Sequence, residues 1–191
     1  MPRWPSGYGA GLLIPLEKSY ASSTLARGVL SLQEDEMKLR KPEKQEFRIY
    51  AHLETKFFKH HKPYGTLLQD ISPEKRNLKK EFEDLIKQKN AFFRFAEFDG
   101  EIAGYVYGLI EKIGGNEKGW KKKGELNSIV VLSEFRGKGI AKFMTNEFLS
   151  WLKSKGVRYA EMSCNVKNKG MIKLAKKLNF KEQHITFGKM L

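Results

Sequence analysis

Cysteine and long hydrophobic runs are what this 191-residue sequence most clearly lacks. Its single thiol, Cys164, excludes an internal disulfide framework and a zinc site built from several thiolates. A reducing compartment, by default the cytoplasm, is then the simplest assumption. No apolar stretch approaches the roughly 20 residues that cross a bilayer, so we expect a soluble protein without a membrane partner.

Acidic residues are scarce relative to basic ones: 36 Lys and Arg stand against 22 Asp and Glu, a formal net charge of +14. Such an excess suits nucleic acid or any other anionic partner. The basic residues are nevertheless spread through many segments, among them 75–80, 121–123 and 176–177, as on solvated helix faces and loops. Charge alone therefore does not identify a partner.

The first 36 residues differ from the rest of the chain. Glycine, serine and proline are scattered there without a period of 2 or 3.6, and three basic against four acidic residues make the segment slightly acidic. It lacks the basic end, unbroken apolar stretch and cleavage site of a secretory signal. Since 191 residues suit one domain, we expect the folded domain to span 37–191, starting at Met37, and residues 1–36 to be an extension outside the core.

Hydrophobic periodicity after Met37 predicts helices alternating with strands. Apolar residues three and four apart indicate helix faces, and runs rich in β-branched and aromatic residues around an Asp99-Gly100 turn indicate a hairpin. The expected elements are, in order, a strand at 37–42, a helix at 43–59, a loop at 60–65, a helix opened by Pro73, strands at 91–98 and 101–113, a loop at 114–124 and a strand at 125–132. This order predicts an α/β (α+β) fold.

A glycine-bearing loop joins the last of these strands to a further helix. Gly137 and Gly139 lie in this loop, and the apolar residues from Ile140 to Leu152 recur four apart, as on a buried helix face. Glycines let backbone N–H groups turn toward a ligand, and the helix N-terminus adds the positive end of its dipole. The spacing excludes a Walker A loop and a complete dinucleotide fingerprint. The loop is therefore a phosphate site or a plain tight turn.

The segment Arg136-Gly137-Lys138-Gly139-Ile140-Ala141 resembles the Arg/Gln-x-x-Gly-x-Gly/Ala signature of the GNAT superfamily of N-acetyltransferases and matches each fixed position. Residues 159–166 resemble the family's next strand, and 168–180 resemble its closing helix. The resemblance is clear over residues 91–180. It implies a single GNAT-like domain with a mixed, mostly antiparallel central sheet, splayed near its centre and flanked by helices.

The resemblance also implies acetyl-CoA as cosubstrate and names the main chain that would bind it. A strand would hydrogen-bond the pantetheine like a neighbouring strand, and the glycine loop would bind the pyrophosphate. The cofactor-binding residues implied are Ile129, Val130, Val131, Arg136, Gly137, Lys138, Gly139, Ile140, Ala141, Lys142 and Asn168. The side chains of Ile129 and Val131 fit a plain core equally well, and Asn168 fits a helix N-cap.

Transfer to an amine requires a base, stabilisation of the thioester oxygen and departure of the thiolate. Glu125 is the candidate base, because it lies eleven residues before Arg136, where histone-type family members carry a catalytic glutamate. The alternative is an exposed residue at a strand edge. The family resemblance assigns oxyanion stabilisation to a strand amide, and that of Val131 is the candidate.

Three residues of the C-terminal motif region bear on the chemistry. Ala175 stands where the family often has a tyrosine that protonates the thiolate, although a thiol pKa near 8.5 already makes the thiolate a fair leaving group. Asn179 replaces the usual glycine after the helix and tolerates the left-handed conformation. Cys164 lies on the strand expected beside the thioester, where an acyl-enzyme is conceivable but a buried small hydrophobe fits better without a histidine nearby.

The histidines indicate no metal site. His60 and His61 are adjacent, and neither carboxylates nor thiols cluster beside them, so we expect no metal. The resemblance places the acceptor groove between the first two helices and the sheet. Tyr50, Phe57, His61 and Tyr64 could border that groove, or simply pack.

These observations predict an N-acetyltransferase that transfers the acetyl group of acetyl-CoA by direct attack of a primary amine. The acceptor, a small-molecule amine or a protein amine, stays open, although the basic body disfavours polycations. The alternatives are a nucleic-acid-binding or regulatory module that keeps the fold with little catalysis, and a CoA-binding structural subunit. A homodimer is compatible with each of these functions.

Overall fold

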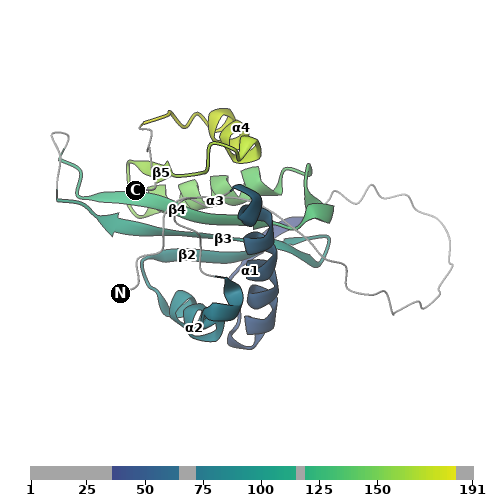
Figure 1. The fold of residues 1–191 in the computed structure, drawn as a ribbon. Helices are drawn as coiled ribbons and strands as arrows, with labels where there is room; N and C mark the ends of the chain where they lie inside the picture. The colour runs from purple at the N-terminus through teal and green to yellow at the C-terminus, as the bar shows by residue number, and fades with distance from the viewer. Residues whose placement is uncertain (1–35, 65–71, 115–118, 184–191) are drawn as a thin grey trace, which may run out of the picture.

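A five-stranded sheet in the order β1-β2-β3-β4-β5 forms the centre of the computed structural model, which describes residues 36–64, 72–114 and 119–183 (Figure 1). Its first four strands pair antiparallel, and the last joins β4 in parallel. The sheet is therefore mixed and mostly antiparallel, as expected. Its strands are β1 (Met37–Arg40), β2 (Ala91–Phe98), β3 (Glu101–Lys112), β4 (Lys122–Val131) and β5 (Ala160–Met162).

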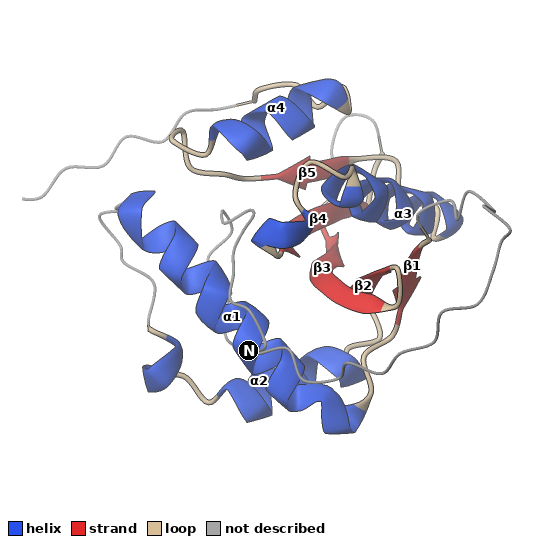
Figure 2. Ribbon diagram, turned by 90° about the vertical axis from the view of Figure 1, so that its right-hand side faces the viewer, coloured by secondary structure: helices blue, strands red, loops and turns tan. Residues whose placement is uncertain are grey.

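Helices flank both faces of this sheet, so the molecule has three layers (Figure 2). One hydrophobic cluster lies between the sheet and the helices α1 and α2, and a second lies between the sheet and α3, with α4 packed beside it. The helices are α1 (Phe47–His61), α2 (Leu78–Lys87), α3 (Ile140–Ser154) and α4 (Lys169–Lys177). We call the first side of the sheet the α1–α2 face and the second the α3 face.

The two faces of the sheet differ in the side chains that they bury. On the α3 face, Met144 and Phe148 of α3 are fully buried against apolar strand residues. The α1–α2 face is largely aromatic: the ring of Tyr50 stacks on Phe82 at a centroid distance of 5.3 Å and meets the edge of Phe93 at 5.9 Å. Such aromatic contacts supply a large buried area with defined geometry, so α1 is held firmly against the sheet.

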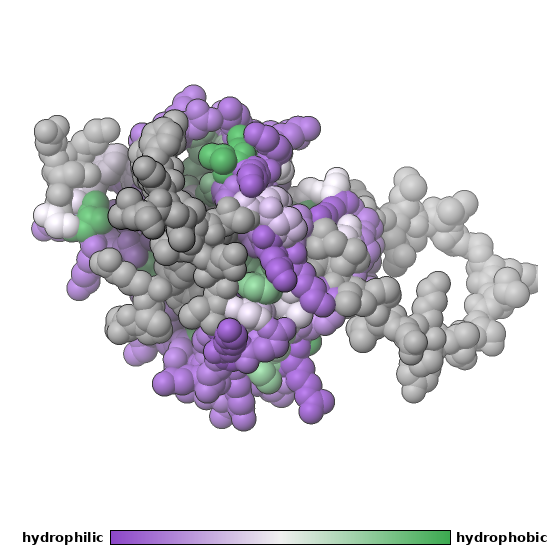
Figure 3. All heavy atoms as spheres, in the orientation of Figure 1, coloured by the Kyte–Doolittle hydropathy of each residue, from purple (hydrophilic) through white to green (hydrophobic). Residues whose placement is uncertain are grey.

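Hydrophilic side chains cover most of the described surface on the face drawn in Figure 3, and hydrophobic ones form small separate patches. Among the described residues, Val166 is the exposed large hydrophobic side chain, at 70%. The described helices include none that is both long and apolar enough to cross a membrane. The expectation that residues 1–36 form an extension concerns a segment that lies, apart from Glu36, outside the described residues.

Several element boundaries differ from those expected. His60 and His61 end α1 rather than lie in a loop, and Pro73 opens only a 3-10 turn, since α2 begins at Leu78. β4 begins at Lys122, because the long end of β3 pairs with its polar lysines, Lys112 opposite Lys122. β5 stops at Met162, so residues 163–166 lie beyond the strand that was expected to contain them.

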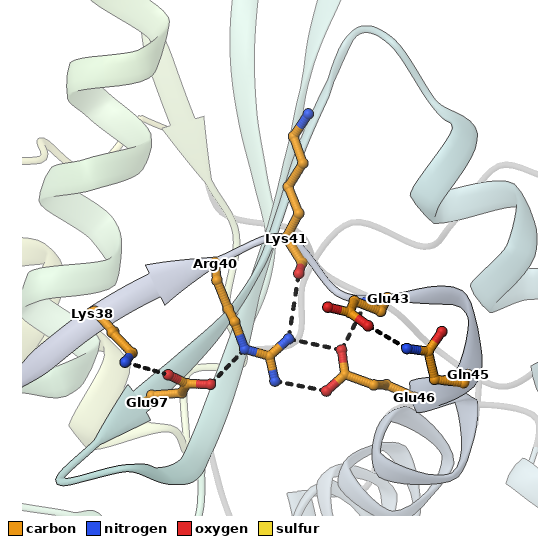
Figure 4. A network of polar contacts seen from close by, with 7 residues as sticks. All are labelled: Lys38, Arg40, Lys41, Glu43, Gln45, Glu46 and Glu97. Carbon is orange, nitrogen blue, oxygen red and sulfur yellow. Dashed lines mark hydrogen bonds and ion pairs between the residues drawn. The ribbon is translucent and has the colours of Figure 1, made fainter.

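An ion-pair network fixes the entry to α1 (Figure 4). The Arg40 guanidinium on β1 donates two hydrogen bonds to the Glu46 carboxylate, at 2.7 and 2.6 Å, and a third to Glu97 on β2. The nearby Arg40 guanidinium lowers the pKa of the Glu46 and Glu97 carboxyl groups. Glu46 also accepts from the N–H of Glu43 at 2.7 Å in a capping box. The start of α1 is therefore tied to two strands, which positions the α1–α2 face.

Gly104 in β3 provides a stability test of the contact between β3 and β4. A Cβ at this position would lie 1.8 Å from the carbonyl oxygen of Val130, so the β4 main chain would have to move. We expect Gly104→Ala to lower the free energy of unfolding by about 2–3 kcal/mol, as overpacking of a core does. Gly114→Ala, at an exposed glycine with nothing within 4 Å, is the control and should leave urea unfolding nearly unchanged. Equal unfolding midpoints for the two variants would contradict this packing.

Candidate active site

The glycine loop between β4 and α3 adopts a conformation that turns its main chain outward. Gly137 and Gly139 have φ values of 79° and 84°, in the left-handed region that favours glycine. Gly139 is the N-cap of α3 and has no side chain to accept from the first N–H groups of the helix, which lack carbonyl partners within it. These N–H groups and the helix dipole can therefore bind an anion such as a phosphate.

The charged side chains of this loop pack against the protein. The Lys138 ammonium lies 4.2 Å from the ring centroid of Phe98 and 5.8 Å from that of Phe135, and Arg136 Nε lies 3.4 Å from the carbonyl oxygen of Val131. Burial lowers the pKa of Arg136. Arg136 thus ties the loop to the end of β4 and Lys138 ties it to the end of β2, while residues 136–139 all stay exposed to solvent.

The sheet opens between β4 and β5 close to this loop. β5 pairs with β4 only from Gly124 to Leu126, opposite Ala160 to Met162. From that point to its end at Val131, β4 has no paired strand on this edge among the described residues. The splay that the resemblance implied is therefore confirmed.

A β-bulge at Asn127 decides which main-chain groups face this opening. Tyr107 lies opposite Ser128 while Gly108 lies opposite Leu126, so Asn127 is one extra residue in β4. Before the bulge, the N–H of Gly124 points to β5 and bonds the Tyr159 carbonyl at 2.8 Å.

After the bulge, the alternation of N–H directions along β4 is shifted by one residue. The N–H of Leu132 donates to Ala103 near the start of β3 at 2.8 Å, and successive N–H groups of a strand point to opposite edges. The N–H groups of Ile129 and Val131 therefore point into the opening. Their side chains are only 1% and 4% exposed and belong to the core, as one of the two expectations for them stated.

Glu125 is held inside the sheet rather than at an exposed edge. It pairs with Leu109 of β3 on one side and with Glu161 of β5 on the other, and it is half-buried. Burial, followed by the nearby Glu111 carboxylate, raises its pKa, and Lys123 opposes that rise. A carboxyl group with a raised pKa is a stronger base once ionised, which fits proton transfer.

Two polar residues next to Glu125 were missed by the reasoning from sequence. The side-chain oxygen Oδ1 of Asn127 is buried and has no hydrogen-bond partner in the described part of the chain. Ser128 is partly buried, and its side chain lies close enough to the Tyr105 hydroxyl to lower the pKa of Tyr105. The signal available was this pair of polar residues between the apolar residues Leu126 and Ile129 of the same strand.

The closing helix confirms two expectations. Asn168 is 3% exposed and caps α4, because its side chain accepts from the N–H of Met171 at 3.1 Å. A contact with CoA stays a prediction for this residue. Asn179 has φ 62°, the left-handed conformation expected where the family has glycine. Burial raises the pKa of the Cys164 thiol, so this residue is a poor nucleophile.

The four residues suggested for the acceptor groove mostly pack. Tyr50, Phe57 and His61 are 1%, 9% and 5% exposed, and the rings of Phe57 and His61 stack at 4.4 Å. Tyr64 is hydrogen-bonded through its hydroxyl to His60 Nε2 at 2.8 Å. Within the described residues, no three His, Cys, Asp or Glu side chains gather in a way that would hold a metal ion.

Comparison with curated proteins finds archaeal relatives. The chain is 32% identical over 107 residues to an uncharacterised N-acetyltransferase of Methanocaldococcus jannaschii, an alignment that covers 56% of this chain and 46% of the relative. It is 36% identical over 107 residues to an N-alpha-acetyltransferase of Sulfurisphaera tokodaii, with 53% and 63% covered. The alignments thus span less than two-thirds of the length of these relatives.

Structural comparison agrees on the fold. A predicted acetyltransferase from Clostridium acetobutylicum, solved with acetyl-CoA, superimposes with a TM-score of 0.62 at 13% identity and covers 81% of this chain and 96% of its own. At this identity the likeness shows the fold alone. The model of the acetyltransferase (GNAT) family matches residues 48–180, well over half of the chain and including the strand, the loop and the capped helix described above. The chain therefore belongs to the GNAT family of acetyltransferases.

Proposed function

We propose that this acetyltransferase transfers the acetyl group of acetyl-CoA to a primary amine by direct attack. The observation that carries the proposal is the continuity of two sets of main-chain donors. The N–H groups of Ile129 and Val131 face the opening between β4 and β5, and the glycine loop with its helix N-terminus follows within a few residues. An extended, amide-rich pantetheine fits the first set, and a pyrophosphate fits the second.

The residues proposed to hold the cofactor do so mainly through their main chain. They are Ile129, Val130 and Val131 on β4, the loop and helix residues from Arg136 to Lys142, and Asn168 at the start of α4. Acetyl-CoA supplies an acetyl group that is activated as a thioester. The N–H of Val131, which points into the opening, is the proposed donor to the thioester oxygen as negative charge develops there.

Glu125 is the proposed base that prepares the amine. An ammonium group cannot attack a carbonyl carbon until it has lost a proton, and the half-buried Glu125 carboxylate faces the same side of the sheet as α1 and α2. Ala175 has no hydroxyl group to protonate the departing sulfur, so the thiolate leaves as such and takes its proton from water.

Peptide α-amines are the first acceptors to test. One relative is called an N-alpha-acetyltransferase, and a positively charged body such as this one gathers the anionic cosubstrate but disfavours polycationic amines. Small primary amines belong in the same panel. Salt-sensitive nucleic-acid binding without transfer to any amine would favour a regulatory module instead.

Cofactor binding through the glycine loop can be tested at one residue. In Gly139→Ala, an alanine would have to keep φ near +84°, which costs about 1–2 kcal/mol, or distort the loop. We expect calorimetry to show acetyl-CoA affinity lowered about tenfold, the equivalent of about 1.4 kcal/mol. Gly156→Ala, at φ +71° beyond the other end of α3, is the control, since its strain is similar but it lies away from the loop. Equal affinity in both variants would refute phosphate binding by this loop.

The role of Glu125 can be tested by substitution and by pH. Glu125→Gln should lower turnover about 100-fold, the lower part of the range for general-base catalysis, with acetyl-CoA affinity unchanged. Glu101→Gln, on the exposed start of β3, is the control. Unchanged turnover in Glu125→Gln would remove this residue from the mechanism.

Turnover of the native protein should rise with pH as Glu125 ionises, because only the carboxylate accepts a proton. Glu111→Gln removes a charge that raises the pKa of Glu125, so it should move this inflection to lower pH. Thiol release measured across pH gives both results. An inflection that stays in place would contradict the coupling between the two carboxyl groups.

A further inference from the structure

A chain of buried polar groups runs beneath the acceptor side of the sheet, from α1 through β3 to β4. The Tyr105 hydroxyl donates a hydrogen bond to Glu54 Oε1, and the side chain of Ser128 lies close enough to lower the pKa of Tyr105. Glu54 and Tyr105 are each 2% exposed, whereas Ser128 is only partly buried. The chain therefore has one end in the interior and one end at the surface of β4.

The hydroxyl hydrogens of this series of polar groups point inward. An ionised carboxylate only accepts, so the Tyr105 proton lies toward Glu54. With its own proton committed, the Tyr105 oxygen can only accept from Ser128, and a hydroxyl group directed at that oxygen as a donor lowers the pKa of Tyr105, as Ser128 does. The lone pairs of Ser128 Oγ are thereby left to accept a hydrogen bond from outside.

The inner end of the chain can hold a proton. Arg76 Nη1 lies 2.7 Å from Glu54 Oε2 and Arg76 Nη2 lies 2.6 Å from Glu81 Oε2, so two carboxylates share one guanidinium. The groups that face Glu54 are Tyr50 on its own helix, Arg76 and Glu81 from the α2 side, and Tyr105 from β3. Burial raises the pKa of Glu54, although Arg76 and Tyr105 oppose the rise.

The outer end of the chain lies where the reaction is proposed to occur. Ser128 follows the bulge residue Asn127 and precedes Ile129, whose N–H points into the opening between β4 and β5. Its register partner Tyr107 and the nearby Tyr105 both belong to the cluster under α1 and α2. The hydroxyl is therefore on the acceptor side of the strand that is proposed to bind the thioester.

Resting on the proposed acetyl transfer, we propose that Ser128, Tyr105 and Glu54 form a relay that takes the second proton from the attacking amine. Ser128 is the catalytic residue, since its oxygen would touch the nitrogen. Tyr105 and Glu54 act through Ser128 and are positioning residues. Glu125 keeps its proposed role as the base that accepts the first proton of the ammonium group.

The protons and electrons of these reaction steps balance. The ammonium gives one proton to Glu125, and the neutral amine attacks the carbonyl carbon, which forms the N–C bond and leaves a positive charge on nitrogen. The nitrogen then gives a proton to Ser128 Oγ, while the Ser128 proton passes to Tyr105 and the Tyr105 proton to Glu54. The C–S bond breaks, and its electron pair leaves with the CoA thiolate, which takes a proton from water.

The relay is reset after the product leaves. The proton on Glu54 returns outward through Tyr105 and Ser128 to solvent, and Glu125 releases its own proton directly. Each turnover thus delivers two protons from the amine to solvent and returns one from water to the thiolate. No oxidant, metal or further reactant is needed.

Tyrosine substitutions on β3 give a matched test of the relay. Tyr105→Phe removes the central hydroxyl, whereas Tyr107→Phe removes a hydroxyl that is hydrogen-bonded to Gln88 at 3.0 Å and lies outside the relay. Tyr105 and Tyr107 are both buried, at 2% and 4%, so the two variants perturb packing similarly. We expect the single-turnover rate to fall about 100-fold in Tyr105→Phe, as for loss of a general base, and to stay near the native value in Tyr107→Phe.

Serine substitutions complete the test. Ser128→Ala should lose as much rate as Tyr105→Phe, with acetyl-CoA affinity retained, and Ser128→Thr should restore it because the hydroxyl is kept. The double variant should be no slower than either single variant, since one break already stops the relay.

The outcomes separate the relay from the proposed function. A native rate in Ser128→Ala, multiplied losses in the double variant, or an equal loss in Tyr107→Phe would overturn the relay while acetyl transfer stands. Absence of acetyl-CoA binding or of transfer to any amine by the native protein would overturn the proposed function and the relay together.

Discussion

One extra residue in β4 organises the whole candidate site. Because Asn127 forms a bulge, the N–H groups of Ile129 and Val131 face the open edge of the sheet rather than β3. The opposite strand accommodates the bulge through a glycine: a Cβ at Gly108 would lie 2.7 Å from the Glu125 carbonyl oxygen. The glycine loop then follows at the end of the strand. Main-chain geometry, more than side-chain identity, thus shapes the site proposed for an extended cosubstrate.

The two faces of the sheet bury different kinds of side chain. The α3 face is a largely apolar core, whereas the α1–α2 face buries Glu54 and Tyr105 among aromatic rings, with Arg76 partly buried beside Glu54. A buried ion pair is not an efficient source of stability, because the desolvation of its charges offsets much of their attraction. Charges placed on the α1–α2 face, the proposed acceptor side of the sheet, are therefore better explained by the proposed proton chemistry than by stability alone. The Arg40 network at the entry to α1 keeps that helix, and with it Glu54, in register with the strands.

The sequence predicted what depends on local spacing and missed what depends on pairing across the sheet. The loop at Gly137 and Gly139, the N-cap at Asn168 and the left-handed Asn179 follow from a few neighbouring residues, and each has the expected conformation. The mixed sheet and its splay came from the family resemblance. The bulge could not be predicted, because an extra residue is defined only against the partner strand. The contact between Glu54 and Tyr105 likewise joins residues 51 positions apart, which no periodicity encodes.

Ala175 explains why the proposed acid–base groups act on the nitrogen rather than on the sulfur. A family member with a hydroxyl at this position can protonate the sulfur, but this chain has a methyl group there. With a thiol pKa near 8.5 the thiolate is a tolerable leaving group, so the harder requirement lies on the nitrogen, which must lose two protons. A nitrogen that keeps its second proton is itself the better leaving group, and the intermediate then collapses back to the thioester. Removing that proton quickly commits the intermediate to breaking the C–S bond. In the proposed mechanism, acid–base groups on the acceptor side therefore compensate for the alanine on the cofactor side.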